Sequence, residues 1–253
     1  MKLKCIVGSI LITLSFVLGI GILSSIFMII FKNGMEHVVL ISGIAQTLYL
    51  MLATTILKMR KINMQNTYGL RLVSFKEYVL PILAAFCFSA FSNILQSVVP
   101  IPQELIGGMS DDMEKSTIAF ILSIFIIAPI VEEFVFRALI LTKLRKEFSV
   151  TASVLICAFM FALIHIMAGG IITVIHAFLG GAIFSLAYVK TKSLFPAIAA
   201  HIFGNIGGYI TTFTNNLSTT LQYVASIGFF LATIVFCILL IRKKNNQLFL
   251  YKK

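Results

Sequence analysis

The chain is poor in charged residues. Of its 253 residues, 11% are Asp, Glu, Lys or Arg, whereas 59% are apolar. An ordinary soluble domain carries about 25% charged residues, so this composition excludes one. In place of charge, the chain has apolar runs that recur from end to end and are long enough to cross a hydrocarbon layer of about 30 Å.

Closely spaced cysteine and metal-binding patterns are also missing. The 4 cysteines stand in four separate apolar runs, at Cys5, Cys87, Cys157 and Cys237. We therefore interpret them as small hydrophobic side chains rather than as disulfides or a zinc cluster. The chain also lacks HExxH, the local helix motif of soluble zinc proteases.

The recurring apolar runs predict an all-α fold, a polytopic membrane helix bundle of about eight transmembrane helices. We expect a single membrane-embedded domain over residues 1–253, because no soluble domain, low-complexity tract or internal repeat interrupts the pattern. The expected spans are residues 5–31, 37–57, 78–99, 117–141, 150–168, 170–189, 193–213 and 219–241.

Positive charge predicts the orientation of these spans. All of the 20 Lys and Arg residues except Lys32, Lys115 and Arg137 fall in the termini and loops of one side. By the positive-inside rule, both termini are cytoplasmic. The net charge of +11 is then a topology signal, which indicates a lipid bilayer rather than nucleic acid as partner. Richness in Ile, Phe and Lys, without an organelle-targeting signal, favours a multi-pass protein of a bacterial cell membrane.

Three ionisable residues interrupt the expected span at 117–141. Glu132, Glu133 and Arg137 stand there among apolar residues, and burying one charge in a bilayer costs roughly 2.5–3.5 kcal/mol. In an α-helix Glu133 and Arg137 share a face, whereas Glu132 points about 140° away from Arg137. We therefore predict a Glu133–Arg137 ion pair and a Glu132 carboxylate available for chemistry. Pro129 should open the helix just before the acids. The alternative is a purely structural buried pair.

Two later spans supply further polar residues. Phe161 and His165 are four residues apart on one face of the fifth span, as are His201 and Asn205 on the seventh. We expect His176, in the sixth span, to be a hydrogen-bonded packing residue. The expected catalytic core is residues 117–213.

This set of side chains suits hydrolysis. A buried carboxylate that is linked through water to an imidazole can act as a general base, while Asn205 and a second histidine can donate hydrogen bonds to an oxyanion. A glutamate with two histidines is also a zinc-ligand set, which here would be Glu132, His165 and His201. The residues alone leave both readings open.

The ordered motifs resemble those of a known family. Glu132-Glu133-xxx-Arg137, Phe161-xxx-His165 and His201-xxx-Asn205 are similar to the three-motif signature of the CPBP family, the CAAX proteases and bacteriocin-processing (Abi) proteins. The resemblance implies an intramembrane endopeptidase in which Glu132 and His165 activate water and His201 and Asn205 stabilise the oxyanion. It implies supporting roles for Glu133, Arg137 and Phe161. Older descriptions make the family zinc-dependent, and the newer view is glutamate-driven hydrolysis without a metal, which we favour.

The expected function is therefore cleavage of a peptide or membrane-protein substrate near the bilayer. One alternative is a non-catalytic bacteriocin immunity or scaffold protein, although a pure binder has no evident need for Glu132. Another is a transporter with a Glu–His proton relay, which an inverted repeat would favour, and the sequence shows none.

Overall fold

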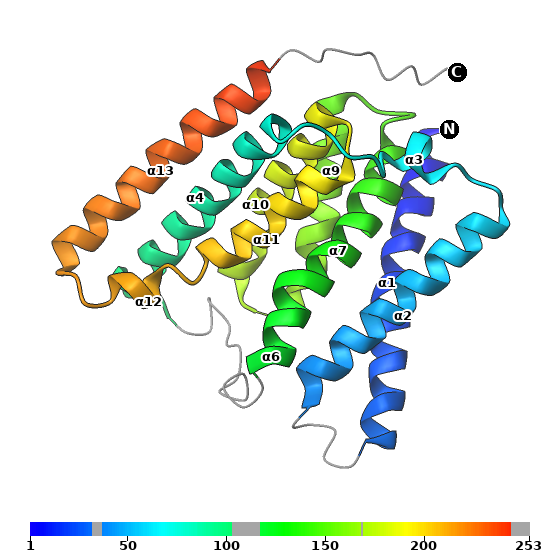
Figure 1. Ribbon diagram of the computed structural model, residues 1–253, viewed down its shortest axis with the longest axis horizontal. Helices are drawn as coiled ribbons and strands as arrows, with labels where there is room; N and C mark the ends of the chain where they lie inside the picture. The colour runs from blue at the N-terminus through cyan, green and yellow to red at the C-terminus, as the bar shows by residue number, and fades with distance from the viewer. Residues whose placement is uncertain (32–36, 103–116, 168, 244–253) are drawn as a thin grey trace. The chain divides into compact units, whose positions relative to one another are not determined.

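A computed structural model describes residues 1–31, 37–102, 117–167 and 169–243, and all of the regular structure in these ranges is helical (Figure 1). Contacts group the chain into two compact units. The first unit comprises Met1–Leu70 and Met109–Phe148, and the second comprises Arg71–Gly108 and Ser149–Lys253. The single domain over residues 1–253 stays a prediction.

The first unit contains two long helices and one composite helical segment. The long helices are α1 (Lys2–Ile30) and α2 (Val38–Met59), and the short α3 (Met64–Tyr68) follows α2. The composite segment consists of α6 (Thr117–Phe120), η3 (Ile121–Ile127), α7 (Ala128–Glu133), η4 (Phe134–Leu141) and α8 (Thr142–Leu144).

The composite segment is wound unevenly. Both η3 and η4 are π-helices, in which hydrogen bonds join residues five apart rather than four. The π-helix η3 ends two residues before Pro129, which has no N–H to donate, so the expected loosening of the helix before the acids is present. The six-residue α7 that carries the two glutamates is thus bounded by wider turns on both sides.

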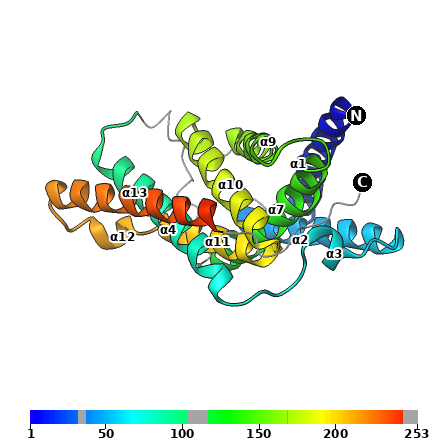
Figure 2. The ribbon, with the colours of Figure 1, turned by 90° about the horizontal axis from the view of Figure 1, so that it is seen from above.

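The helices of the second unit are α4 (Lys76–Val98), α9 (Val150–Leu163), the 3₁₀ turn η5 (Ile164–Met167), α10 (Ile171–Thr191), α11 (Leu194–Gly207), the short α12 (Thr211–Thr214) and α13 (Thr219–Arg242). In this unit α4 is central, because it packs against α10, α11 and α13. Figures 1 and 2 both show α13 lying along α4.

Side-chain contacts fix the directions of the helices around α4. The α13 helix runs antiparallel to α4, since Lys243 pairs with Glu77 at 2.9 Å while Ser97 donates to Gln222 at 3.4 Å near the other end. The α11 helix runs parallel to α4 and approaches it closely at Gly207. A side-chain carbon on Gly207 would stand 2.5 Å from the Phe86 carbonyl oxygen, so only glycine permits this approach.

Six helices of the described ranges are long and apolar enough to cross a membrane, namely Lys2–Ile30, Val38–Met59, Lys76–Val98, Ile118–Leu144, Ile171–Thr191 and Thr219–Arg242. The helices at Val150–Ile166 and Leu194–Gly207 are apolar but shorter. The protein is therefore a polytopic helix bundle, and the six long helices and two shorter ones lie where the eight spans were expected. Glycines end both short helices early: Gly169 and Gly170 follow η5, and Gly207 and Gly208 close α11.

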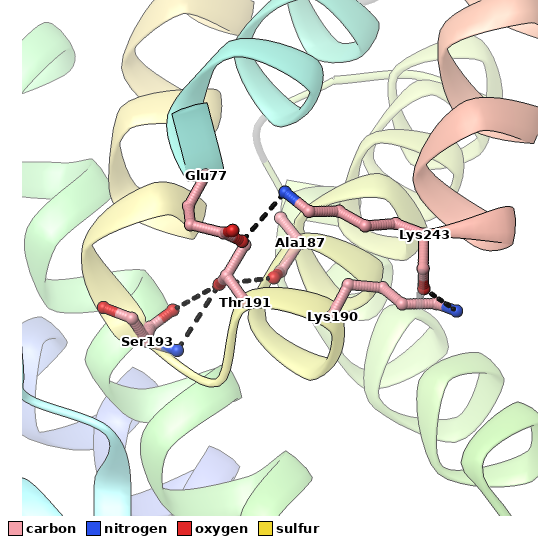
Figure 3. A network of polar contacts seen from close by, with 6 residues as sticks. All are labelled: Glu77, Ala187, Lys190, Thr191, Ser193 and Lys243. Atoms are coloured by element: carbon pink, nitrogen blue, oxygen red, sulfur yellow. Dashed lines mark hydrogen bonds and ion pairs between the residues drawn. The ribbon is translucent and has the colours of Figure 1, made fainter. Parts of the chain in front are cut away.

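Basic residues gather at one end of the second unit (Figure 3). There Lys190 donates to the carbonyl oxygens of Ile241 and Lys243, which end α13, and the Lys243 ammonium pairs with Glu77. Burial, and secondarily the Arg71 charge, lower the pKa of Lys192 beside this end. The helix ends that the charge pattern assigns to the cytoplasm thus lie together.

The first unit shows the same grouping of basic helix ends. The Lys2 ammonium lies 5.8 Å from the centre of the Phe148 ring, and the Cys5 thiol donates to the Lys143 carbonyl oxygen at 3.4 Å. The start of α1 and the residues after α8 therefore share one end of the unit. Lys32 and Lys115, which were predicted on the opposite side, lie outside the described residues.

Candidate active site

The first unit contains the ion pair that the spacing predicts. Arg137 Nη1 donates to Glu133 Oε1 at 2.8 Å, and both side chains are fully buried. Glu133 ends α7 and Arg137 lies in the first turn of η4, so the pair joins the two segments. Burial strengthens the mutual attraction of the two charges and raises the cost of losing either one.

Glu132 differs from its neighbour in exposure. It lies in α7 and is partly exposed, whereas Glu133 is fully buried. The predicted angle of about 140° between Glu132 and Arg137 assumed a continuous α-helix, and the π-helix from Phe134 onward makes that value inapplicable. The division of roles between the two carboxylates stays a prediction.

In the second unit, His165 lies in the 3₁₀ turn that ends the short α9 helix, rather than deep within a long span. Its Nδ1 is 2.9 Å from the carbonyl oxygen of Phe161. A carbonyl oxygen can only accept, so Nδ1 carries the proton and donates it. In the neutral ring, Nε2 then presents its lone pair as a base.

His201 and Asn205 lie on consecutive turns of α11. His201 is buried, and Asn205 is partly exposed. The imidazole of His201 stacks on Phe184 of α10 with 4.5 Å between ring centres and 17° between planes, while Phe161 meets it edge-on at 5.8 Å. Two aromatic rings from two other helices therefore restrain the His201 ring.

Phe161 connects the two histidines of the motifs. Its ring centre lies 4.7 Å from that of His165 and 5.8 Å from that of His201. Its carbonyl oxygen also accepts the proton of His165 Nδ1. The phenylalanine of the second motif thus orients both imidazoles in the second unit, a role that spacing alone does not reveal.

His176 joins this aromatic cluster, with hydrogen bonds to α4. Its Nδ1 lies 2.9 Å from Ser92 Oγ, its Nε2 lies 3.5 Å from Ser89 Oγ, and its ring stacks on Phe88 at 4.8 Å. This environment agrees with the hydrogen-bonded packing residue that we expected. Sequence reasoning missed its partners, although three-residue spacing of Ser89 and Ser92 on one helix face was a usable signal.

Among the described residues, no group of three or more His, Cys, Asp and Glu side chains is placed to hold a metal ion. Glu132 belongs to the first unit, while His165, His201 and Asn205 belong to the second. The convergence of all four on one cavity, like the zinc-ligand set that includes Glu132, therefore stays a prediction.

Comparisons with known proteins agree with the motif pattern. Residues 114–207 match a family described as type II CAAX prenyl endopeptidase Rce1-like. The chain is 34% identical over 197 residues to the membrane-embedded CAAX protease MroQ of Staphylococcus aureus (strain USA300), a match that covers 72% of this chain and 77% of the relative. No solved structure matches the chain.

Proposed function

Because this chain belongs to the CAAX protease family, we propose that it is an intramembrane endopeptidase that cleaves a peptide bond of a membrane-associated protein or peptide. Membership of the family supports endopeptidase activity in general, and the assignment of individual residues is our own proposal. The observation that carries it is the 2.9 Å contact between His165 Nδ1 and the Phe161 carbonyl oxygen, because a proton on Nδ1 leaves Nε2 as the base that water activation requires.

In the proposed reaction, Glu132 and His165 take a proton from a water molecule, whose oxygen attacks the carbonyl carbon of the scissile bond. His201 and Asn205 donate hydrogen bonds to the oxyanion that forms. The tetrahedral intermediate collapses, the C–N bond breaks, and the proton held by Glu132 and His165 passes to the leaving amine. Glu133 and Arg137 hold α7 against η4 so that Glu132 keeps its place.

A zinc-assisted reaction would use the same side chains in another way. Glu132, His165 and His201 would be the ligands, and the metal would lower the pKa of its bound water. For the metal-independent reaction, we expect purified protein to retain peptidase activity after exhaustive chelation and to contain well under one zinc ion per chain. Loss of activity on chelation that zinc restores would replace the proposed mechanism with the metal-assisted one.

A test in cells does not require an identified substrate. The chromosomal copy is replaced by Glu132→Gln, by His165→Ala or by the double variant, and new peptide termini in the membrane proteome are compared by mass spectrometry. Each single variant should abolish the same set of cleavage products at unchanged protein abundance. The double variant should lose no more than either single variant, because residues that act as one unit lose activity together.

His37→Ala is the matched control, since His37 caps the start of α2 and lies outside the motifs. It should leave the cleavage products unchanged. Cleavage products and cellular phenotype that persist in the double variant at normal abundance would retire the protease proposal and favour a binding or immunity protein.

We also propose that both termini face the cytoplasm of a bacterial cell membrane, as the basic helix ends of each unit indicate. Fusion of alkaline phosphatase, which is active only outside the cytoplasm, to Lys253 should give an inactive reporter. A fluorescent protein at the same position should be bright. An active phosphatase fusion together with a dark fluorescent fusion would show that the C-terminus faces away from the cytoplasm.

A further inference from the structure

A series of aromatic rings lies in the second unit between His176 and His165. We name it the ring row, and it consists of His176, Phe88, Phe184, His201, Phe161 and His165. Phe88 stacks on His176 at 4.8 Å, and Phe184 stacks on His201 at 4.5 Å. Phe88 and Phe184 both lie within 3.8 Å of the position that a side-chain carbon on Gly180 would occupy, so the two groups of rings approach each other at Gly180.

One end of the ring row is tied to α4 by hydrogen bonds. Ser92 Oγ accepts a hydrogen bond from Gln96 Nε2 at 3.0 Å and lies 2.9 Å from His176 Nδ1. These hydrogen bonds can all form at once when the Ser92 hydroxyl donates to His176 Nδ1. The proton of the imidazole is then on Nε2, on the side of Ser89. In an apolar interior, where water does not compete, such bonds hold two helices in a fixed register.

This tie has a consequence for His201. His176 and Phe184 lie two turns apart on α10, so a helix whose rotation is fixed at His176 also has a fixed direction at Phe184. Phe184 in turn sets the plane of His201, on which it stacks with 17° between planes. We propose that His176 is a positioning residue, which orients the His201 imidazole by anchoring α10 to Ser92. Its importance for catalysis rests on the oxyanion role proposed above for His201.

The experiment follows the NMR signals of the histidine rings, which are few in this chain. The chain contains 4 of them, so selective ¹⁵N-imidazole labelling of the full-length protein in lipid nanodiscs gives few ring signals to assign. Ser92→Ala removes one oxygen atom and should shift the ring signals of both His176 and His201, while those of His37 stay unchanged. His176→Phe should shift the His201 signals at least as far. His176→Asn places an amide near the Nδ1 position, so it should restore them toward the wild-type values.

Ser226→Ala is the matched control. Ser226 is buried and donates to the Phe91 carbonyl oxygen at 3.4 Å, so this variant also removes a serine contact to α4, but from the α13 side. It should leave the His201 signals in place. His201 signals that move no further in Ser92→Ala than in Ser226→Ala would overturn the positioning role. Because this measurement needs no substrate, its failure is distinguishable from failure of the protease proposal.

Discussion

The two units keep polar side chains in apolar surroundings by different means. The first unit uses a pair of full charges, Glu133 and Arg137, at 2.8 Å and with no exposed surface. The second unit uses imidazoles in contact with phenylalanine rings, of which that of His176 lies at hydrogen-bond distance from a serine hydroxyl and that of His165 from a carbonyl oxygen. A charge pair concentrates its stabilisation in one contact, so one substitution destroys it, whereas stacked rings distribute theirs over many weak contacts.

The largest expected effect is therefore on the charge pair. Glu133→Gln should lower the free energy of unfolding by about 3–5 kcal/mol, because the Arg137 charge stays buried after its ion-pair partner becomes neutral. Denaturant unfolding of the detergent-purified protein measures this loss. Glu132→Gln is the same chemical change at a partly exposed neighbour and should cost about 1 kcal/mol or less. Equal losses in the two variants would show that the roles of the two acids are divided wrongly.

A steric substitution in the second unit comes next. Gly207→Ala should cost about 1–3 kcal/mol, because the new carbon, 2.5 Å from the Phe86 carbonyl oxygen, must push α11 away from α4. In the control Gly204→Ala, the nearest atoms would be 3.6 Å away, which is ordinary contact. Thermal unfolding of both variants compares them, and a Gly204 variant that is the less stable of the two would contradict the close approach at Gly207.

Removal of one ring from the ring row should have a smaller effect. Phe184→Leu keeps an apolar side chain but loses the stack on His201, which is worth about 0.5–1.5 kcal/mol beyond the change in buried area. Phe203→Leu, at an exposed position of the same α11 that carries His201, is the control. Indistinguishable unfolding curves for the two variants would mean that the stack adds no stability and that the contrast between the units is overstated.

The smallest effect should come from a charge pair that is not buried. Lys243→Met breaks the 2.9 Å pair with Glu77, whose partners are 24% and 30% exposed, and should cost about 0.2–1 kcal/mol. Water and ions screen such a pair, so this loss should fade in roughly 1 M salt while that of Glu133→Gln persists. If Lys243→Met lowers the free energy of unfolding equally at low and high salt, the predicted difference between the exposed pair and the buried pair is wrong.

The fold class and the buried ion pair were predictable because they depend on local pattern. Apolar runs of about 20 residues indicate membrane helices, and the four-residue spacing of Glu133 and Arg137 brings their side chains together on one helix. The angular argument for Glu132 failed where η4 departs from the α-helical period. Hydropathy also overestimated the length of α11, which ends at Gly207, because it counts apolar residues and does not detect where glycines end a helix.

The ring row depends on tertiary contacts and so could not be read from spacing. His176 and Ser92 are 84 residues apart in the chain, and His201 and Phe184 belong to different helices. Nothing local to Gly207 distinguishes it from Gly204 or Gly208 before the backbone of α4 is in place. The sequence predicted which polar residues to examine in the second unit, and only the packing shows what restrains them.

The two short helices also bear on the supply of a reactant. The α11 helix has 14 residues and rises about 21 Å, and α9 also has 14 residues before the 3₁₀ turn η5, so each is shorter as an α-helix than a hydrocarbon layer of about 30 Å. Irregular backbone at that depth must be hydrogen-bonded by protein or water. His165 lies in the turn at one such helix end. The last carbonyl groups of that turn therefore need hydrogen-bond partners from protein or water, and water is also the second reactant of the proposed hydrolysis.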